Sequence, residues 1–144
     1  LCGLWIGAGV FGCAIPKTPT QELETLQRII RLYNNEFESR SDRGGAMWVK
    51  DEHRAEYLTK IQDINERVSF VNSQILSIVF LKGGNPIGQS GSQPEEKFDE
   101  AVVKTRYQFV VAPSISLQTR TIQQRWVKVK GGWNLIPDLD EFFR

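Results

Sequence analysis

Few side chains in this 144-residue chain have the chemistry for proton transfer. The one histidine, His53, falls on the polar side of a helical pattern, where a solvated imidazole is more common than a catalytic one. Tyr107 occupies an inward position of an alternating strand. A phenol with a pKa near 10 is a poor base at neutral pH. We therefore expect a hydrogen-bonded core tyrosine at this position.

The carboxylates give no stronger case for catalysis. Asp99 and Glu100 stand at the start of a predicted strand and could act as acid or base, but no second group is identifiable that would tune either one for that role. Asp63, near the end of a predicted helix, is expected to be a surface charge. The sequence therefore predicts no catalytic residue and a protein that is not an enzyme.

The cysteines and the charge balance exclude further classes of site. Cys2 and Cys13 both lie in residues 1–16, which carry no charged side chain. The rest of the chain has no thiol, and one histidine is too few for a histidine-rich metal site, so we expect neither a metal nor another cofactor. The chain has 18 Lys and Arg against 17 Asp and Glu. Nucleic-acid binding needs a concentrated basic excess, so we expect no such partner.

The uncharged N-terminal stretch is typical of a targeting segment. It is shorter than the roughly 20 residues that cross a bilayer, but its length suits the apolar core of a secretory signal. Its end, Val10-Phe11-Gly12-Cys13, resembles the lipobox of bacterial lipoproteins, although Phe11 stands where that motif usually has a small or β-branched residue. The resemblance implies lipidation of Cys13, with residues 1–17 as a tether for a domain over 18–144. An uncleaved anchor and an apolar segment buried in a larger assembly are the alternatives.

Two helices are predicted at the start of the domain. Thr18 can cap the first, Pro19 suits its first position, and Gln21 completes a capping box. Apolar residues then recur every three or four positions, which indicates an amphipathic helix: Leu23, Leu26, Ile29, Ile30, Tyr33 and Phe37. A second helix is expected from about residue 51, with one apolar side: Ala55, Leu58, Ile61 and Ile64.

The second half of the chain is predicted to form strands. Residues 74–81 (QILSIVFL) have apolar side chains on both faces, which indicates a central strand covered on both sides. Residues 82–94 are rich in Gly, Ser, Gln and Pro and indicate a mobile loop. Residues 100–111 alternate cleanly as a strand with one buried face. A last hairpin turns at 130–132 and its second strand, 133–136, ends before a proline.

The strand after Pro113 changes its apolar parity. Ile115 and Leu117 share one parity, whereas Ile122 and Trp126 take the other. A strand that changes its buried parity needs a β-bulge or a sharp bend, which we expect near residues 118–121.

Two groups of side chains are candidates for a binding site. Aromatic residues at core positions could line a ligand cavity, although plain packing is the more common role: Trp48, Tyr107, Phe109, Trp126 and Trp133. Basic residues on neighbouring strands could form an outer strip that contacts anionic headgroups or an acidic partner, or an ordinary solvated face: Arg106, Arg120, Arg125, Lys128 and Lys130.

The order of elements, ending in the run QRWVKVKGGW from Gln124 to Trp133, resembles the NTF2-like (cystatin-like α+β) superfamily over residues 19–138. Within it the chain looks most like uncharacterised bacterial lipoproteins, on these residues: Pro113, Ser114, Thr119, Gln124 and Trp126. The resemblance implies an α+β fold in which N-terminal helices pack on a curved antiparallel sheet around a cone-shaped cavity. Some members hold an enzyme site in the cone, and many serve as assembly modules.

We therefore expect a membrane-anchored domain of the bacterial cell envelope that faces the periplasm. Its expected role is that of a non-catalytic binding or scaffold subunit, with a protein partner or a second copy of itself. The first alternative is a binder of small apolar ligands in the cone, which a ligand-sized cavity would favour. The second alternative is an enzyme of the isomerase or dehydratase type. A large apolar patch on the convex face of the sheet would favour the scaffold role.

Overall fold

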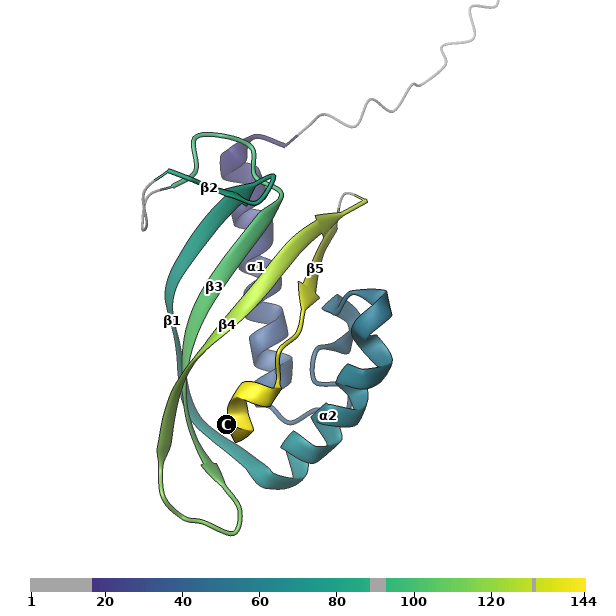
Figure 1. The fold of residues 1–144 in the computed structure, drawn as a ribbon, viewed down its shortest axis with the longest axis vertical. Helices are drawn as coiled ribbons and strands as arrows, with labels where there is room; N and C mark the ends of the chain where they lie inside the picture. The colour runs from purple at the N-terminus through teal and green to yellow at the C-terminus, as the bar shows by residue number, and fades with distance from the viewer. Residues whose placement is uncertain (1–16, 89–92, 131) are drawn as a thin grey trace, which may run out of the picture.

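The computed structural model of the chain describes residues 17–88, 93–130 and 132–144 (Figure 1). The predictions for residues 1–16, including lipidation of Cys13, lie outside the described residues. The elements are α1 (Pro19–Glu38), η1 (Ala46–Trp48), η2 (Asp51–His53), α2 (Arg54–Arg67), β1 (Val68–Lys82), β2 (Asn85–Ile87), β3 (Glu100–Val111), β4 (Gln118–Val129), β5 (Gly132–Ile136) and η3 (Asp140–Phe143), where η denotes a 3₁₀ helix.

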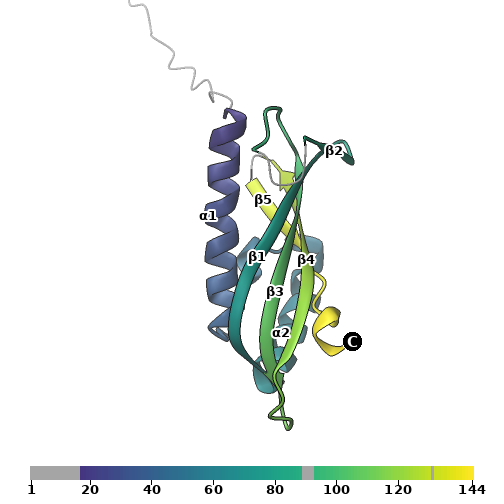
Figure 2. The ribbon, with the colours of Figure 1, turned by 90° about the vertical axis from the view of Figure 1, so that its left-hand side faces the viewer.

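A curved antiparallel sheet forms one layer and the helices form the other. The strand order is β2-β1-β3-β4-β5, and each strand is antiparallel to its neighbours. The sheet bends around α1, α2 and η3, which lie on its concave side (Figures 1 and 2). This arrangement confirms the predicted α+β fold of helices packed on a curved antiparallel sheet.

The first helix, α1, begins at the predicted capping box. The Thr18 side chain accepts a hydrogen bond from the Gln21 amide at 3.2 Å, and the Gln21 side chain accepts one from the Thr18 amide at 3.0 Å. One stripe of α1 is buried against the sheet and α2: Glu22, Leu23, Leu26, Ile30, Tyr33, Asn34 and Phe37. The buried side of α2 carries Tyr57, Ile61 and Ile64, while Leu58 is partly buried and Ala55, predicted on this side, is exposed.

Two glycines turn the chain between the helices. Gly44 and Gly45 have φ angles of +53° and +84°, which L side chains rarely adopt. A Cβ on Gly44 would lie 2.6 Å from the Ile61 side chain, and one on Gly45 would lie 2.5 Å from the Tyr33 ring. Side chains therefore do not fit here, and the turn packs directly against both helices.

The β1 strand differs from the predicted central strand. It pairs with β3 along one edge, whereas β2 covers its other edge only at residues 80–82. Its register with β3 shifts after Phe70 and again after Ile75, and each shift changes which parity faces the core. Residues 74–81 are apolar on both parities for this reason and not because both faces are covered. Ile75 and Leu76 are 41% and 45% exposed.

The predicted mobile loop contains a short strand. Gly83 and Gly84 turn the chain so that β2 returns along the end of β1, with Lys82 opposite Asn85. The prediction of a loop over all of 82–94 was therefore wrong for residues 85–87.

The predicted bulge near residues 118–121 is also wrong. The pairing of β3 with β4 runs without a register shift from Glu100–Val127 to Phe109–Gln118. Ile115 and Leu117 precede β4 and are 93% and 55% exposed, so they take no part in its alternation. The two changes in which parity of residues faces the core lie in β1, at its register shifts after Phe70 and Ile75.

Candidate functional site

Three polar side chains meet on the concave side of the sheet. Asn34 comes from α1, Tyr107 from β3 and Gln124 from β4, and all three are buried. The Tyr107 hydroxyl donates to Asn34 Oδ1 at 2.6 Å and accepts from Gln124 Nε2 at 2.8 Å. Gln124 Nε2 also lies 2.9 Å from Asn34 Oδ1. The cluster joins α1 to two strands and gives buried polar groups the partners they need.

A second buried contact joins α1 to α2. The hydroxyls of Tyr33 and Tyr57 lie 2.9 Å apart, and the Tyr57 hydroxyl donates to the Gly44 carbonyl. Burial raises the pKa of Tyr33, Tyr57 and Tyr107 above the usual value near 10. A phenol with a raised pKa stays protonated at neutral pH, so it has no phenolate form that could act as a base. The role of these hydroxyls is therefore to link helices and strands to one another.

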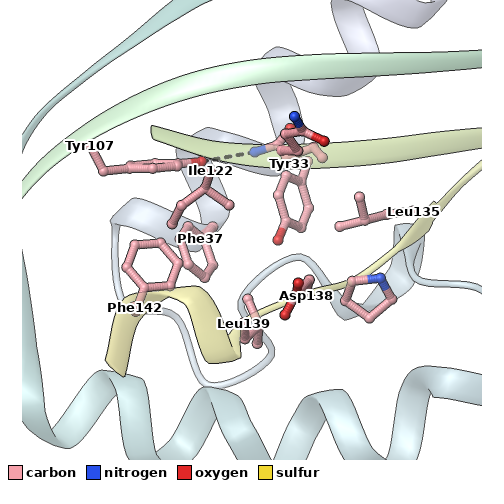
Figure 3. A pocket seen from close by; sticks show the side chains of 11 residues that line it. Tyr33, Phe37, Tyr107, Ile122, Leu135, Asp138, Leu139 and Phe142 are labelled. Carbon is pink, nitrogen blue, oxygen red and sulfur yellow. Dashed lines mark hydrogen bonds between the residues drawn. The ribbon is translucent and has the colours of Figure 1, made fainter. Parts of the chain in front are cut away.

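On the concave side of the sheet, side chains from α1, β3, β4 and η3 line a small pocket (Figure 3). From η3, the Phe142 ring packs with centroid distances between 5.3 and 5.6 Å against Phe37, Phe70, Tyr107 and Phe109. The space left beside Phe37, Tyr107 and Phe142 is about 10 Å³. That volume is at the threshold for one water molecule, so this space has no room for a small-molecule ligand.

Most aromatic residues predicted to line a cavity instead fill the core. Trp126 and Phe109 are fully buried, and the Trp126 ring makes an edge-to-face contact with Tyr33 at 5.6 Å. Trp133 is 4% exposed, and its Nε1 donates to Glu22 Oε1 at 2.7 Å. Trp48 is partly exposed and packs against the core. Of the five predicted residues, Tyr107 alone borders the small remaining space.

The remaining candidate acids and bases lie outside this interior. His53 is partly exposed, with its Nε2 3.5 Å from Glu52 Oε1. Asp63 is exposed and lies 3.6 Å from the Arg67 guanidinium. The structure does not bring these two side chains to the Tyr107 hydroxyl, whose hydrogen-bond partners are the amides described above.

The carboxylates at the start of β3 also have partners of their own. Asp99 is exposed, and its Oδ2 accepts from the Gly83 amide at 3.4 Å. Glu100 lies on the convex face and pairs with Arg125. Both side chains therefore have partners other than the Tyr107 hydroxyl.

The predicted basic strip does not lie on one face of the sheet. Arg106 and Arg125 occupy the exposed parity of β3 and β4 and point from the convex face. Arg106 Nη2 donates to Gln74 Oε1 at 2.6 Å, across the neighbouring strand. Two of the five basic residues therefore form contacts on the outer surface.

The other basic residues of that prediction lie elsewhere. Arg120 and Lys128 share the parity of the buried side of β4. Arg120 Nη1 donates to the Glu141 carbonyl at 3.2 Å, and Lys128 Nζ lies 2.9 Å from Glu22 Oε1. Lys130 lies in the turn after β4, with φ +47°. The prediction of one strip was wrong because the alternation of β4 sends Arg120 and Lys128 to the concave side.

The sequence reasoning missed Asn34 and Gln124. Each is a polar residue at a buried position: Asn34 continues the stripe of Ile30, and Gln124 stands between Ile122 and Trp126 on one parity. A polar residue inside an apolar period signals a buried hydrogen-bonded group.

Residues 17–88, 93–130 and 132–144 hold neither a metal-binding cluster nor a membrane-spanning helix. They contain no group of three or more His, Cys, Asp or Glu side chains arranged to hold a metal ion. Among the same residues, no helix combines the length and the apolar character needed to span a membrane.

Comparisons with known proteins give the fold alone. No protein-family model matches the chain, and no curated protein matches it. A solved structure, the solution structure of a SEC-C motif containing protein from Rhodopseudomonas palustris, is similar to this chain with a TM-score of 0.56 and 12% sequence identity. The match covers 83% of this chain and 77% of that chain. At this identity the similarity supports the α+β fold and carries no function.

Proposed function

We propose that this chain is an NTF2-like domain of the bacterial cell envelope, tethered to the membrane through Cys13 and facing the periplasm. It acts as a non-catalytic binding or scaffold subunit of a larger assembly. The observation that carries the proposal is the filled interior: about 10 Å³ remains where members of this superfamily hold a substrate or ligand. A domain whose cone is occupied by its own side chains binds through its outer surface.

The state of the buried tyrosines supports the non-catalytic role. Burial raises the pKa of the Tyr107 phenol, and its hydroxyl is engaged by the Asn34 and Gln124 amides. Proton transfer needs a group tuned near the working pH and within reach of a substrate. The same packing argues against a small apolar ligand in the cone, because such a ligand must first displace Phe142.

The convex face of the sheet is not the large apolar patch that would favour a scaffold role. Its central positions carry polar side chains: Lys104, Arg106, Gln108, Thr119, Thr121 and Gln123. Among the described residues, Ile115 is the most exposed large apolar side chain, at 93%, and Leu117 in the same loop between β3 and β4 is 55% exposed; other exposed apolar side chains lie on β1, with Val71 at 64%. This loop is at the opposite end of the molecule from the start of α1 (Figure 1). We assign partner contact to this loop.

The length of the strands separates the proposed tether from the β3–β4 loop. Of the two strands that carry the loop, β3 is 12 residues long, which corresponds to about 40 Å of strand. A domain anchored next to α1 thus holds Ile115 and Leu117 far from the bilayer, where a periplasmic partner can reach them.

The test is extraction of the full chain from native membranes in mild detergent, followed by size measurement with light scattering and by mass spectrometry of the co-isolated proteins. We expect a stoichiometric complex with a partner or a second copy. The double variant Ile115→Ser, Leu117→Ser should lose most of the co-isolated partner, whereas Ser114→Ala, Ser116→Ala in the same loop should retain it. Recovery of the wild-type chain alone, as a monomer, would contradict the proposal.

A further inference from the structure

A pocket outside this interior lies beside the start of α1. The start of α1 is at the top of Figure 1. Its volume is about 200 Å³. Three separate segments form its walls: the start of α1 with Lys17, the approach to β3 with Lys97 and Phe98, and the end of β4 with Lys128. The fold therefore brings three lysines that are far apart in the sequence to the border of one pocket.

The charges of this pocket favour an anion. Its one carboxylate, Glu22, has a 7% exposed side chain, and its Oε1 lies 2.9 Å from Lys128 Nζ and accepts from Trp133 Nε1 at 2.7 Å. The negative charge is thus directed into the protein and holds Lys128 in place. Lys17 Nζ lies 3.2 Å from the neutral Thr25 hydroxyl. Among the described residues, no carboxylate lies within 4.0 Å of the ammonium groups of Lys17 or Lys97.

We propose that this pocket binds the phosphate group of an anionic phospholipid headgroup. Lysine ammonium groups bind phosphate as compact point charges. The pocket also has an apolar side, since Phe98 is 4% exposed and lines it beside Pro19. A phospholipid presents a negatively charged phosphate close to its apolar acyl chains, and so offers a partner both for the lysines and for the Phe98 and Pro19 side of the pocket.

The position of the pocket selects a lipid as the source of the phosphate, and this step rests on the proposed membrane tether. Lys17 follows Cys13 by four residues, which span at most about 14 Å of extended chain. Acylation of Cys13 therefore keeps the pocket within reach of the headgroups. Headgroup binding at this end then orients the long strands away from the bilayer and directs the β3–β4 loop toward the periplasm.

The experiment measures lipid binding to the full chain in detergent micelles by native mass spectrometry, with dioleoylphosphatidylglycerol and, for comparison, zwitterionic dioleoylphosphatidylcholine. We expect the anionic lipid to bind about tenfold more tightly or better. Lys17→Gln and Lys97→Gln should each weaken its binding about fivefold, the usual effect of one basic residue at an anionic surface. Lys104→Gln on the convex face removes the same charge and should leave binding unchanged. Lys128 is kept because it neutralises Glu22.

Inorganic phosphate separates the two sources of the anion. If phosphate ion binds the wild type, Lys97→Gln weakens that binding, and the two lipids bind equally, then the pocket takes a soluble phosphate and the headgroup assignment is overturned. Equal binding of both lipids, with no effect of either lysine variant and no phosphate binding, would overturn the pocket as an anion site. Lipid binding in micelles does not depend on acylation of Cys13. An unmodified Cys13 would therefore contradict the proposed membrane tether but would not change the result expected for lipid binding.

Discussion

The three tyrosines of the chain all lie in its interior, and their hydroxyls join elements that are distant in sequence. Tyr107 contacts Asn34 across 73 positions of the chain, and Tyr33 contacts Tyr57. Each contact replaces water at a buried polar group, so its loss leaves the partner unsatisfied. These residues have reactive functional groups, but their surroundings suit them to holding the fold together.

Alkaline titration should report this burial directly. The folded-state pKa values of the three tyrosines lie above the unfolded value near 10, so the folded chain keeps protons that the unfolded chain releases. Stability that is fully present below about pH 10 is therefore lost as the pH rises, by up to ~1.4 kcal/mol per pH unit for each buried tyrosine. Urea unfolding followed from about pH 8 to about pH 11.5 measures this slope, and Tyr57→Phe should reduce it.

The absorbance of the phenolate form shows whether the tyrosines ionise while the chain is still folded. It should appear only together with unfolding, because all three phenols are buried. Phenolate formation with a midpoint near pH 10 in a chain that remains folded would show that the tyrosines are accessible.

Truncation of Trp126 tests the assignment of this residue to the core. Trp126 is fully buried, and its ring contacts Tyr33 edge to face. Trp126→Ala should therefore lower the free energy of unfolding by ~3–5 kcal/mol. Gln123→Ala, an exposed position on the same strand, should change it by less than about 0.5 kcal/mol. A shift below about 1 kcal/mol for Trp126→Ala, measured by urea unfolding, is incompatible with a core position.

At the scale of elements, η3 covers part of the concave side of the sheet. Lys60 Nζ lies 3.0 Å from Asp140 and 3.1 Å from Glu56, and the Arg67 guanidinium lies 4.6 Å from the Phe143 ring centroid. Solvent-exposed ion pairs of this kind contribute little to stability. The burial of Phe142 among aromatic rings is therefore the principal interaction that holds η3 in place.

Two neighbouring phenylalanines allow a matched test of this packing. Phe142 is 2% exposed, whereas Phe143 is 38% exposed. Phe142→Ala should cost ~3–5 kcal/mol and leave an apolar cavity, whereas Phe143→Ala should cost less than about 1 kcal/mol. Thermal unfolding with and without benzene measures both effects, since an apolar cavity of this kind binds such a molecule. Equal costs for the two variants, with no stabilisation by benzene, would show that η3 does not fill the cone.

An element can be predicted from the sequence when the interactions that form it are between residues close together in the chain. The capping box of α1 and the alternation of β3 depend on neighbouring residues, and the sequence predicts both correctly. The bulges of β1 depend on its pairing with β3, which is not local, so the sequence placed the parity change in β4 instead. The division of the basic residues between two faces follows from the buried parity of β4, because Arg120 and Lys128 share the parity of Ile122 and Trp126, so the sequence did contain this signal. Only the three-dimensional packing shows that Lys17 and Lys97 share a pocket.

At the scale of the whole molecule, the two ends have different surfaces. The end beside the start of α1 carries the lysine pocket, and the opposite end carries the apolar β3–β4 loop (Figure 1). Under the proposed function, the first end faces the membrane and the second faces a partner. This polarity depends on where the chain is anchored, so the membrane tether is the claim on which both proposals rest.

Intact-mass spectrometry of the protein isolated from membranes of its native host tests that claim most directly. The account predicts a chain that begins at Cys13 and carries a diacylglyceryl group on that residue, because Cys13 follows an apolar run and a small residue and lies just before the helix start at Thr18. The Cys13→Ser variant should retain residues 1–12 and gain no lipid mass. A wild-type mass that retains residues 1–12, with an unmodified Cys13, would contradict the account.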